Sequence, residues 1–175
     1  MVAAGALSIG MRTPRTRADD VRAVYEAVLR SECIAPDSPR VVVYDATWFD
    51  VDDDVQPFED LSPSTFDDYR AQPEGALPRQ LALHIPIERI TAAEFSALVD
   101  DYGGLDGAWR RFYELHPGAL GSVEFSPVGF NRDRSEALVH IGQQRGPLFG
   151  RGRFVRLTRT SSGWQVVDRV GTWIS

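Results

Sequence analysis

The sequence has few of the features that mark secreted or membrane proteins. Its single cysteine, Cys33, cannot form an intramolecular disulfide, so no disulfide framework indicates the compartment. No stretch approaches the roughly 18 apolar residues that are needed to cross a bilayer. The apolar residues 1–10 have no Lys or Arg ahead of them, although a signal peptide carries that charge. We therefore expect a cytoplasmic protein without a membrane partner.

Positive charge is also in the minority. The chain has 25 Asp and Glu residues against 19 Lys and Arg residues, which gives a formal net charge of −6. Non-specific binding to nucleic acids depends on a cationic surface that displaces counterions. The charge balance therefore argues against a nucleic-acid partner, and the expected partner is a protein or a small molecule of unknown identity.

Signatures of catalysis and of metal binding are missing as well. No serine lies in a Gly-x-Ser-x-Gly elbow, and His84, His116 and His140 lack the His-Glu-x-x-His spacing of zinc hydrolases. Cys33 follows a predicted helix end, where the helix dipole disfavours its thiolate. Whether the chain is an enzyme stays open, and we expect no cofactor.

The composition is that of one folded domain. Apolar residues make up 43% and charged residues 25% of the 175 residues, which is close to the globular average. This length suits one hydrophobic core and leaves little room for a second. Residues 1–15 are interpreted as a disordered tail, and residues 16–175 as a single α+β domain.

Periodicity and capping patterns predict three helices. Apolar residues at helical spacing predict the first over residues 17–30, with Thr16 as its N-cap. The sequence Thr91-Ala-Ala-Glu94 is a capping box and predicts a second helix that ends near residue 101. Asp106 is expected to cap the third helix, which carries an aromatic stripe.

Between the first two helices, one strand and a long irregular segment are expected. The β-branched run at residues 40–47 predicts the strand. Residues 50–80 contain four prolines and an acidic run, which predict a long surface excursion. Asp67 and Asp68 are placed in a brief helical turn within it.

The acidic run is a weak candidate for a calcium site. Asp50, Asp52 and Asp54 have the alternate spacing with which carboxylates converge on a hard cation. The glycine and the glutamate that complete such a loop are absent, because Val55 and Leu61 take their places. A solvated acidic loop is therefore preferred to a metal site.

From Gly121 onward the pattern changes to the alternation that is typical of strands. Four strands are predicted, at about residues 122–130, 136–142, 152–160 and 164–174. The loop 161–163 would join the last two strands and place Arg156 opposite Asp168, where the two side chains would form an ion pair. The predicted fold class is α+β, with about three helices packed on one face of a curved, mainly antiparallel sheet that ends in a four-stranded meander.

The same C-terminal third resembles an uncharacterised family of bacterial α+β proteins. The stretches that carry the resemblance are Gly129-Phe130-Asn131, Ala137-Leu138-Val139, Gly150-Arg151-Gly152, Gly163-Trp164-Gln165-Val166-Val167 and Thr172-Trp173-Ile174-Ser175. Members of that family often carry Cys-Gly-Gly-Leu-Cys where this chain has Arg145-Gly146-Pro147-Leu148-Phe149. The resemblance therefore implies no redox or metal role for this loop, and it implies no activity. The order of elements is also similar to cystatin-like and NTF2-like folds, which often enclose a ligand pocket.

The glycine-rich hairpin loop 143–152 is the first candidate for a binding site. It carries Leu148 and Phe149 at its tip, with Arg145 and Arg151 on either side. Apolar side chains beside arginine are typical of surfaces that bind a partner. The first hypothesis is therefore a non-enzymatic binding or interaction module. A plainer interpretation, in which Phe149 folds back onto the sheet, stays open.

The second hypothesis is a small-molecule or hydrolytic pocket between helix and sheet. His140 alternates with two apolar neighbours and so points to the opposite face of its strand. If that face is concave, His140 could lie near Asp168 or Tyr113 and act as a general base. A structural histidine is the plainer interpretation. A deep polar cavity would favour this pocket, whereas a filled core with an exposed apolar loop would favour the interaction module.

Overall fold

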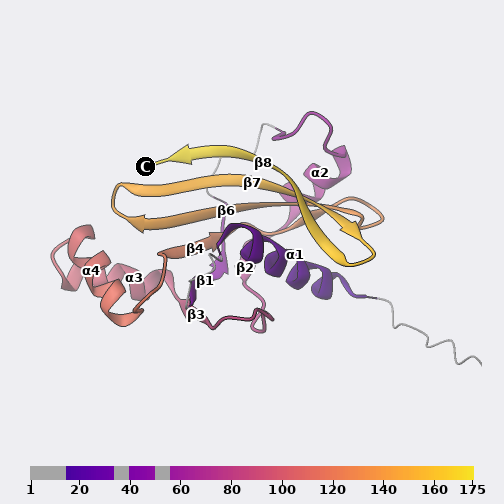
Figure 1. The fold of residues 1–175 in the computed structure, drawn as a ribbon. Helices are drawn as coiled ribbons and strands as arrows, with labels where there is room; N and C mark the ends of the chain where they lie inside the picture. The colour runs from indigo at the N-terminus through magenta and orange to yellow at the C-terminus, as the bar shows by residue number, and fades with distance from the viewer. Residues whose placement is uncertain (1–14, 34–39, 50–55) are drawn as a thin grey trace, which may run out of the picture.

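The computed structural model describes residues 15–33, 40–49 and 56–175 (Figure 1). The predicted tail, apart from Arg15, and the calcium candidates Asp50, Asp52 and Asp54 lie outside these residues. The helices are α1 (Arg17–Glu32), α2 (Pro63–Ala71), α3 (Ala92–Asp101) and α4 (Leu105–Leu115). The strands are β1 (Val41–Thr47), β2 (Gly75–Ala76), β3 (Ile87–Ile90), β4 (Ser122–Phe125), β5 (Gly129–Phe130), β6 (Glu136–Gly146), β7 (Phe149–Thr160) and β8 (Gly163–Ile174). Within the described ranges, no helix combines the length and the apolar character of a bilayer span.

The strands form one mixed sheet in an α+β fold. Their order is β2-β1-β4-β6-β7-β8, while β3 pairs with β1 and β5 pairs with β6. Strand β1 runs parallel to β3 and β4, and the other pairs are antiparallel. The first of the four C-terminal strands that we predicted is divided, because β4 and β5 are separate strands that both pair with β6.

Helices cover both faces of the sheet, so the prediction that they pack on one face is wrong. Val139 of β6 belongs to the apolar cluster that α1 covers, and its neighbour Leu138 points to the opposite face, against Tyr69 of α2. Helices α3 and α4 cover Val42 of β1 on the same side as α2. The physical reason is that residues 136–141 are all buried, although successive side chains of a strand point to opposite faces. Both faces of the sheet must therefore be covered there.

The local signals for the helix ends are largely confirmed. Thr16 caps α1 and Thr91 caps α3, each within a complete capping box. Helix α4 differs, because its N-cap is Gly104 and Asp106 lies inside the first turn. Gly104 has a φ of 107°, a backbone conformation that residues with a side chain rarely adopt.

The long irregular segment contains more structure than its prolines indicate. Helix α2 spans nine residues and has Pro63 at its start, where a missing N–H is tolerated. It contributes Phe66 and Tyr69 to a buried cluster on the sheet. Strands β2 and β3 were not predicted, and His84 precedes β3 without belonging to a strand.

In the β7–β8 hairpin, Arg156 lies opposite Asp168 as predicted, but the register near the turn differs from the prediction. A three-residue loop at 161–163 would leave Thr160 opposite Trp164, but Thr160 pairs with Gly163. A register shift between Leu157 and Arg156 then restores the predicted alignment as far as Arg153, and a second shift follows between Arg153 and Gly152. A bulge of this kind inserts one extra residue into one strand.

The predicted ion pair between Arg156 and Asp168 is nevertheless wrong. Arg156 binds Asp60 at 2.6 Å and Glu136 at 2.8 Å. The carboxylate of Asp168 accepts a hydrogen bond from the backbone N–H of Arg169. The two residues do lie opposite each other, as predicted. Asp60, in the segment before α2, and Glu136 of β6 bind the arginine in place of Asp168.

Candidate binding site

The hairpin that joins β6 and β7 leaves its apolar tip in solvent. Gly146 pairs with Phe149, so only Pro147 and Leu148 form the turn. The side chains of Leu148 and Phe149 are 83% and 66% exposed. Phe149 therefore does not fold back into the core, and the plainer interpretation of this loop is wrong.

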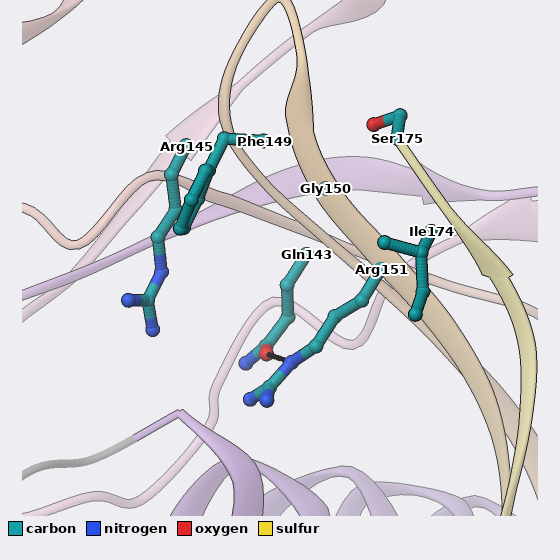
Figure 2. A pocket seen from close by; sticks show the side chains of 7 residues that line it. All are labelled: Gln143, Arg145, Phe149, Gly150, Arg151, Ile174 and Ser175. Atoms are coloured by element: carbon teal, nitrogen blue, oxygen red, sulfur yellow. Dashed lines mark hydrogen bonds between the residues drawn. The ribbon is translucent and has the colours of Figure 1, made fainter.

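A pocket of about 370 Å³ lies beside this hairpin (Figure 2). Its lining residues come from the ends of the three long strands and include three of the four predicted binding residues. They are Gln143, Arg145, Phe149, Gly150, Arg151, Ile174 and Ser175. Leu148 lies at the tip and does not line the pocket.

Strand pairing explains how the pocket forms. Arg151 of β7 lies opposite Gln143 of β6 on one side and opposite Ile174 of β8 on the other. Directly opposed residues share one face of a sheet, so these three side chains lie in a row. Because Gln143 reaches the end of α1, the row begins where that helix stops covering the sheet.

Gln143 connects the pocket to helix α1. Its Nε2 donates to the carbonyl oxygen of Glu32 and to Sγ of Cys33, each at 2.9 Å. Its Oε1 accepts a hydrogen bond from Nε of Arg151 at 2.7 Å, drawn as the dashed line in Figure 2. The amide therefore orients the guanidinium of Arg151, and its two Nη groups donate to no residue in the described ranges.

The two arginines of the pocket have no acidic partner among the described residues. The nearby carboxylate of Glu32 is already bound by Arg153 at 2.7 Å and by Arg169 at 2.5 Å. Both guanidinium groups of the pocket, from Arg145 and Arg151, point to the same side of the hairpin in Figure 2. The site therefore presents two positive charges next to apolar side chains.

The electrostatics of the pocket favour an anion. Partial burial lowers the pKa of Arg151, and the positive charges of Arg153 and Arg145 lower it further. An arginine stays protonated nonetheless, so these charges repel one another at neutral pH. A bound anion would relieve that repulsion.

Cys33 borders this region, in an environment that disfavours its thiolate. Burial raises the pKa of its thiol to about 12. The thiolate is the reactive species, so almost none is present at neutral pH. This environment agrees with the expectation from sequence that the thiolate of Cys33 is disfavoured.

The three candidates for the alternative catalytic pocket occupy separate places. Tyr113 Oη donates to the carbonyl oxygen of Arg145 at 2.8 Å, near the hairpin. His140 lies five residues before Arg145 along β6, so the two backbone positions are about 17 Å apart at roughly 3.3 Å per residue. It is buried and its Nε2 is 2.9 Å from Oγ1 of Thr172. General acid–base contact with Tyr113 is therefore out of reach for His140. Asp168 is exposed on β8, two strands from β6.

Sequence reasoning missed Gln143 as an orienting residue and Ile174 as an apolar wall. Gln143 could have been found only with the full length of β6, which extends four residues beyond its predicted end at 142, and Ile174 only with the register of β8 on β7. The register shifts by one residue between Gln144 and Gly146, and this shift places Gln143 opposite Arg151. No group of three His, Cys, Asp or Glu side chains suited to a metal ion occurs in the ranges that the structure describes.

Comparison with known proteins identified no matching family model, curated protein or solved structure. The interpretation of the pocket therefore depends on its own geometry and chemistry.

Proposed function

We propose that the chain is a non-enzymatic binding module that holds its partner with residues 143–152, the tip of the β6–β7 hairpin, and with the end of β8. The observation that carries the proposal is the combination of exposed apolar side chains with two arginines that have no acidic partner in the described ranges. The apolar side chains are Leu148, Phe149 and Ile174, and the last of them is 91% exposed.

An apolar group of this kind has a clear energetic preference. Burying one Leu, Ile or Phe side chain contributes about 1.5–3 kcal/mol relative to leaving it exposed. Three such side chains in and beside the pocket therefore provide a substantial driving force for association. Exposed apolar patches with a polar rim are common at protein interfaces.

The filled core supports binding at the hairpin over a pocket between helix and sheet. Val24 and Val28 of α1 meet Val139 and Val155 of the sheet, and all four are fully buried. A ligand chamber of the kind found in cystatin-like and NTF2-like folds would need space there. The proposed site lies outside this layer, at the open end of the long strands.

Affinity capture with the immobilised chain tests the proposal. The variant L148S/F149S removes both apolar side chains of the tip without touching the core. The matched control is L115S/V167S, which changes two other exposed apolar side chains, on α4 and β8. Circular dichroism and thermal unfolding should first show that all three proteins are folded.

The expected result is that proteins retained by the unmodified chain are lost with L148S/F149S and kept with L115S/V167S. Retention of the same proteins by L148S/F149S would overturn the proposal. Equal loss with the control would do so as well, because the hairpin would then have no special role.

A further inference from the structure

We propose that the partner is a protein segment that places an Asp or Glu carboxylate between Arg145 and Arg151, with an apolar neighbour on Phe149 and Ile174. This inference rests on the proposed function and names the chemistry of its partner. The occupant is an acidic peptide with large apolar residues beside its carboxylate.

The pairing of arginines along the long strands is the first argument. Strands β6, β7 and β8 carry six arginines, and four of them have an acidic partner. The four are Arg153, Arg156, Arg159 and Arg169. The other two, Arg145 and Arg151, lack an acidic partner in the described part of the chain, and both line the pocket.

This exception is informative because acids outnumber bases in the chain, 25 to 19. A protein with excess carboxylates can readily supply partners for its own arginines, as it does for the four others. Two uncompensated cations side by side repel each other, and their pocket favours an external anion.

The hydrogen-bonding capacity of Arg151 is the second argument. Its Nε is bound by Gln143, whereas no described residue accepts a hydrogen bond from its Nη groups. A guanidinium held at one edge offers its other edge in a fixed orientation, and this geometry matches the two oxygens of a carboxylate. Arg145 adds a second guanidinium on the same side of the hairpin (Figure 2).

The extent of the apolar surface favours a peptide over a small anion. The pocket of about 370 Å³ accommodates a few side chains. Leu148 lies outside it, so the apolar surface continues past the pocket to the hairpin tip. A small carboxylate would leave that tip exposed, whereas an extended segment can cover pocket and tip together. An anionic lipid surface needs a broad basic face, whereas the other four arginines of the long strands are already paired with carboxylates.

Panning a displayed library of random peptides against the full-length chain tests this inference. Four immobilised baits are compared: the unmodified chain, R145Q/R151Q, L148S/F149S and the control R110Q/R132Q. Arg110 and Arg132 are exposed arginines on α4 and in the turn before β6, outside the pocket. Each bait is checked for folding by circular dichroism.

The unmodified chain and R110Q/R132Q should enrich peptides that carry Asp or Glu beside a large apolar residue. R145Q/R151Q should lose the preference for acids. For the most enriched peptide, replacing its acid with the corresponding amide should weaken binding about tenfold or more, as should R145Q/R151Q, because a charge-assisted pair is removed. Added salt should weaken binding to the unmodified chain and have little effect on the remaining binding to R145Q/R151Q.

The outcomes separate this inference from the proposed function. If enriched peptides lack acids but depend on Leu148 and Phe149, the binding loop stands and the acidic partner is wrong. If L148S/F149S enriches the same peptides as the unmodified chain, the proposed function fails. If the unmodified chain enriches nothing beyond L148S/F149S, both fail.

Discussion

Gln143 and Arg151 lie opposite each other on β6 and β7, and their hydrogen bond connects the open end of the sheet to the last turn of α1. The amide oxygen of Gln143 accepts from Arg151 Nε at 2.7 Å, while its Nε2 donates to the carbonyl oxygen of Glu32 at 2.9 Å. The orientation of a pocket arginine is therefore set by the end of a helix more than a hundred residues earlier in the chain.

Replacing Gln143 with Ala tests this connection. The buried amide would be lost, and the carbonyl oxygen of Glu32 would lose a donor, so the free energy of unfolding should fall by about 1–2 kcal/mol. Urea titration followed by circular dichroism measures the change. The control Q165A removes an exposed amide on β8 and should change the stability by less than about 0.5 kcal/mol. Equal stability of Q143A and the unmodified chain would contradict the structural role of Gln143.

Gly152 is expected to be intolerant of a side chain because Trp173 lies across it. A Cβ at this position would stand 2.2 Å from Nε1 of the indole, well inside van der Waals contact. Gly152→Ala should therefore destabilise the fold by about 1–3 kcal/mol through overpacking. The control Gly171→Ala meets no atom within 4 Å, so its melting temperature should stay close to that of the unmodified chain. Similar melting temperatures for both variants would contradict the close packing of Trp173 on Gly152.

Asp20 is expected to contribute strongly to stability. Its side chain is fully buried on α1 and binds Arg159 of β7 at 2.6 Å and Arg134 at 3.1 Å. Asp20→Asn removes the negative charge and leaves two partly exposed arginines facing a buried amide. The free energy of unfolding should fall by about 2 kcal/mol, below the range for a fully buried pair because water screens the arginines. Chemical denaturation of D20N and of the exposed control D100N measures this change. Equal losses in the free energy of unfolding would contradict the role of burial.

Cys33 is expected to resist alkylation in the folded protein. With a pKa of about 12, its thiol stays protonated below that pH, so only about one molecule in ten thousand carries a thiolate at pH 8. In the unfolded chain, a thiol with a pKa near 8.5 is about one quarter thiolate at the same pH. Labelling with iodoacetamide should therefore be on the order of a thousandfold slower in the native state than in urea. Rapid native labelling would show that the thiol is accessible and ionised.

Much of the secondary structure was predictable because its determinants are close together in the sequence. Thr16 and Thr91 satisfy free N–H groups within their own first turns, so a four-residue pattern identifies each cap. Helix α2 was reduced to a turn, because its nine residues lie among prolines and lack a capping side chain. What stabilises it is contact with β6 through Thr65 and Glu136, 71 residues apart, which no local pattern records.

The candidate site was predictable in part for the same reason. Arg145, Phe149 and Arg151 are neighbours on one hairpin, so their proximity follows from the loop itself. Ile174 joins them only because β8 pairs with β7 along its whole length. The suggested grouping of His140 with Asp168 or Tyr113 used strand alternation alone, which identifies a face of the strand and gives no position along it.

The chain alone was sufficient to indicate an α+β domain, its capped helices and a hairpin with apolar and arginine side chains at its tip. Those features depend on interactions between residues a few positions apart. Tertiary structure decided that helices cover both sheet faces, that four arginines of the long strands are paired, and that Arg145 and Arg151 are left beside a pocket. Such pairing depends on which distant carboxylates reach each arginine in the fold, and a pattern of residue types contains no information about that distance.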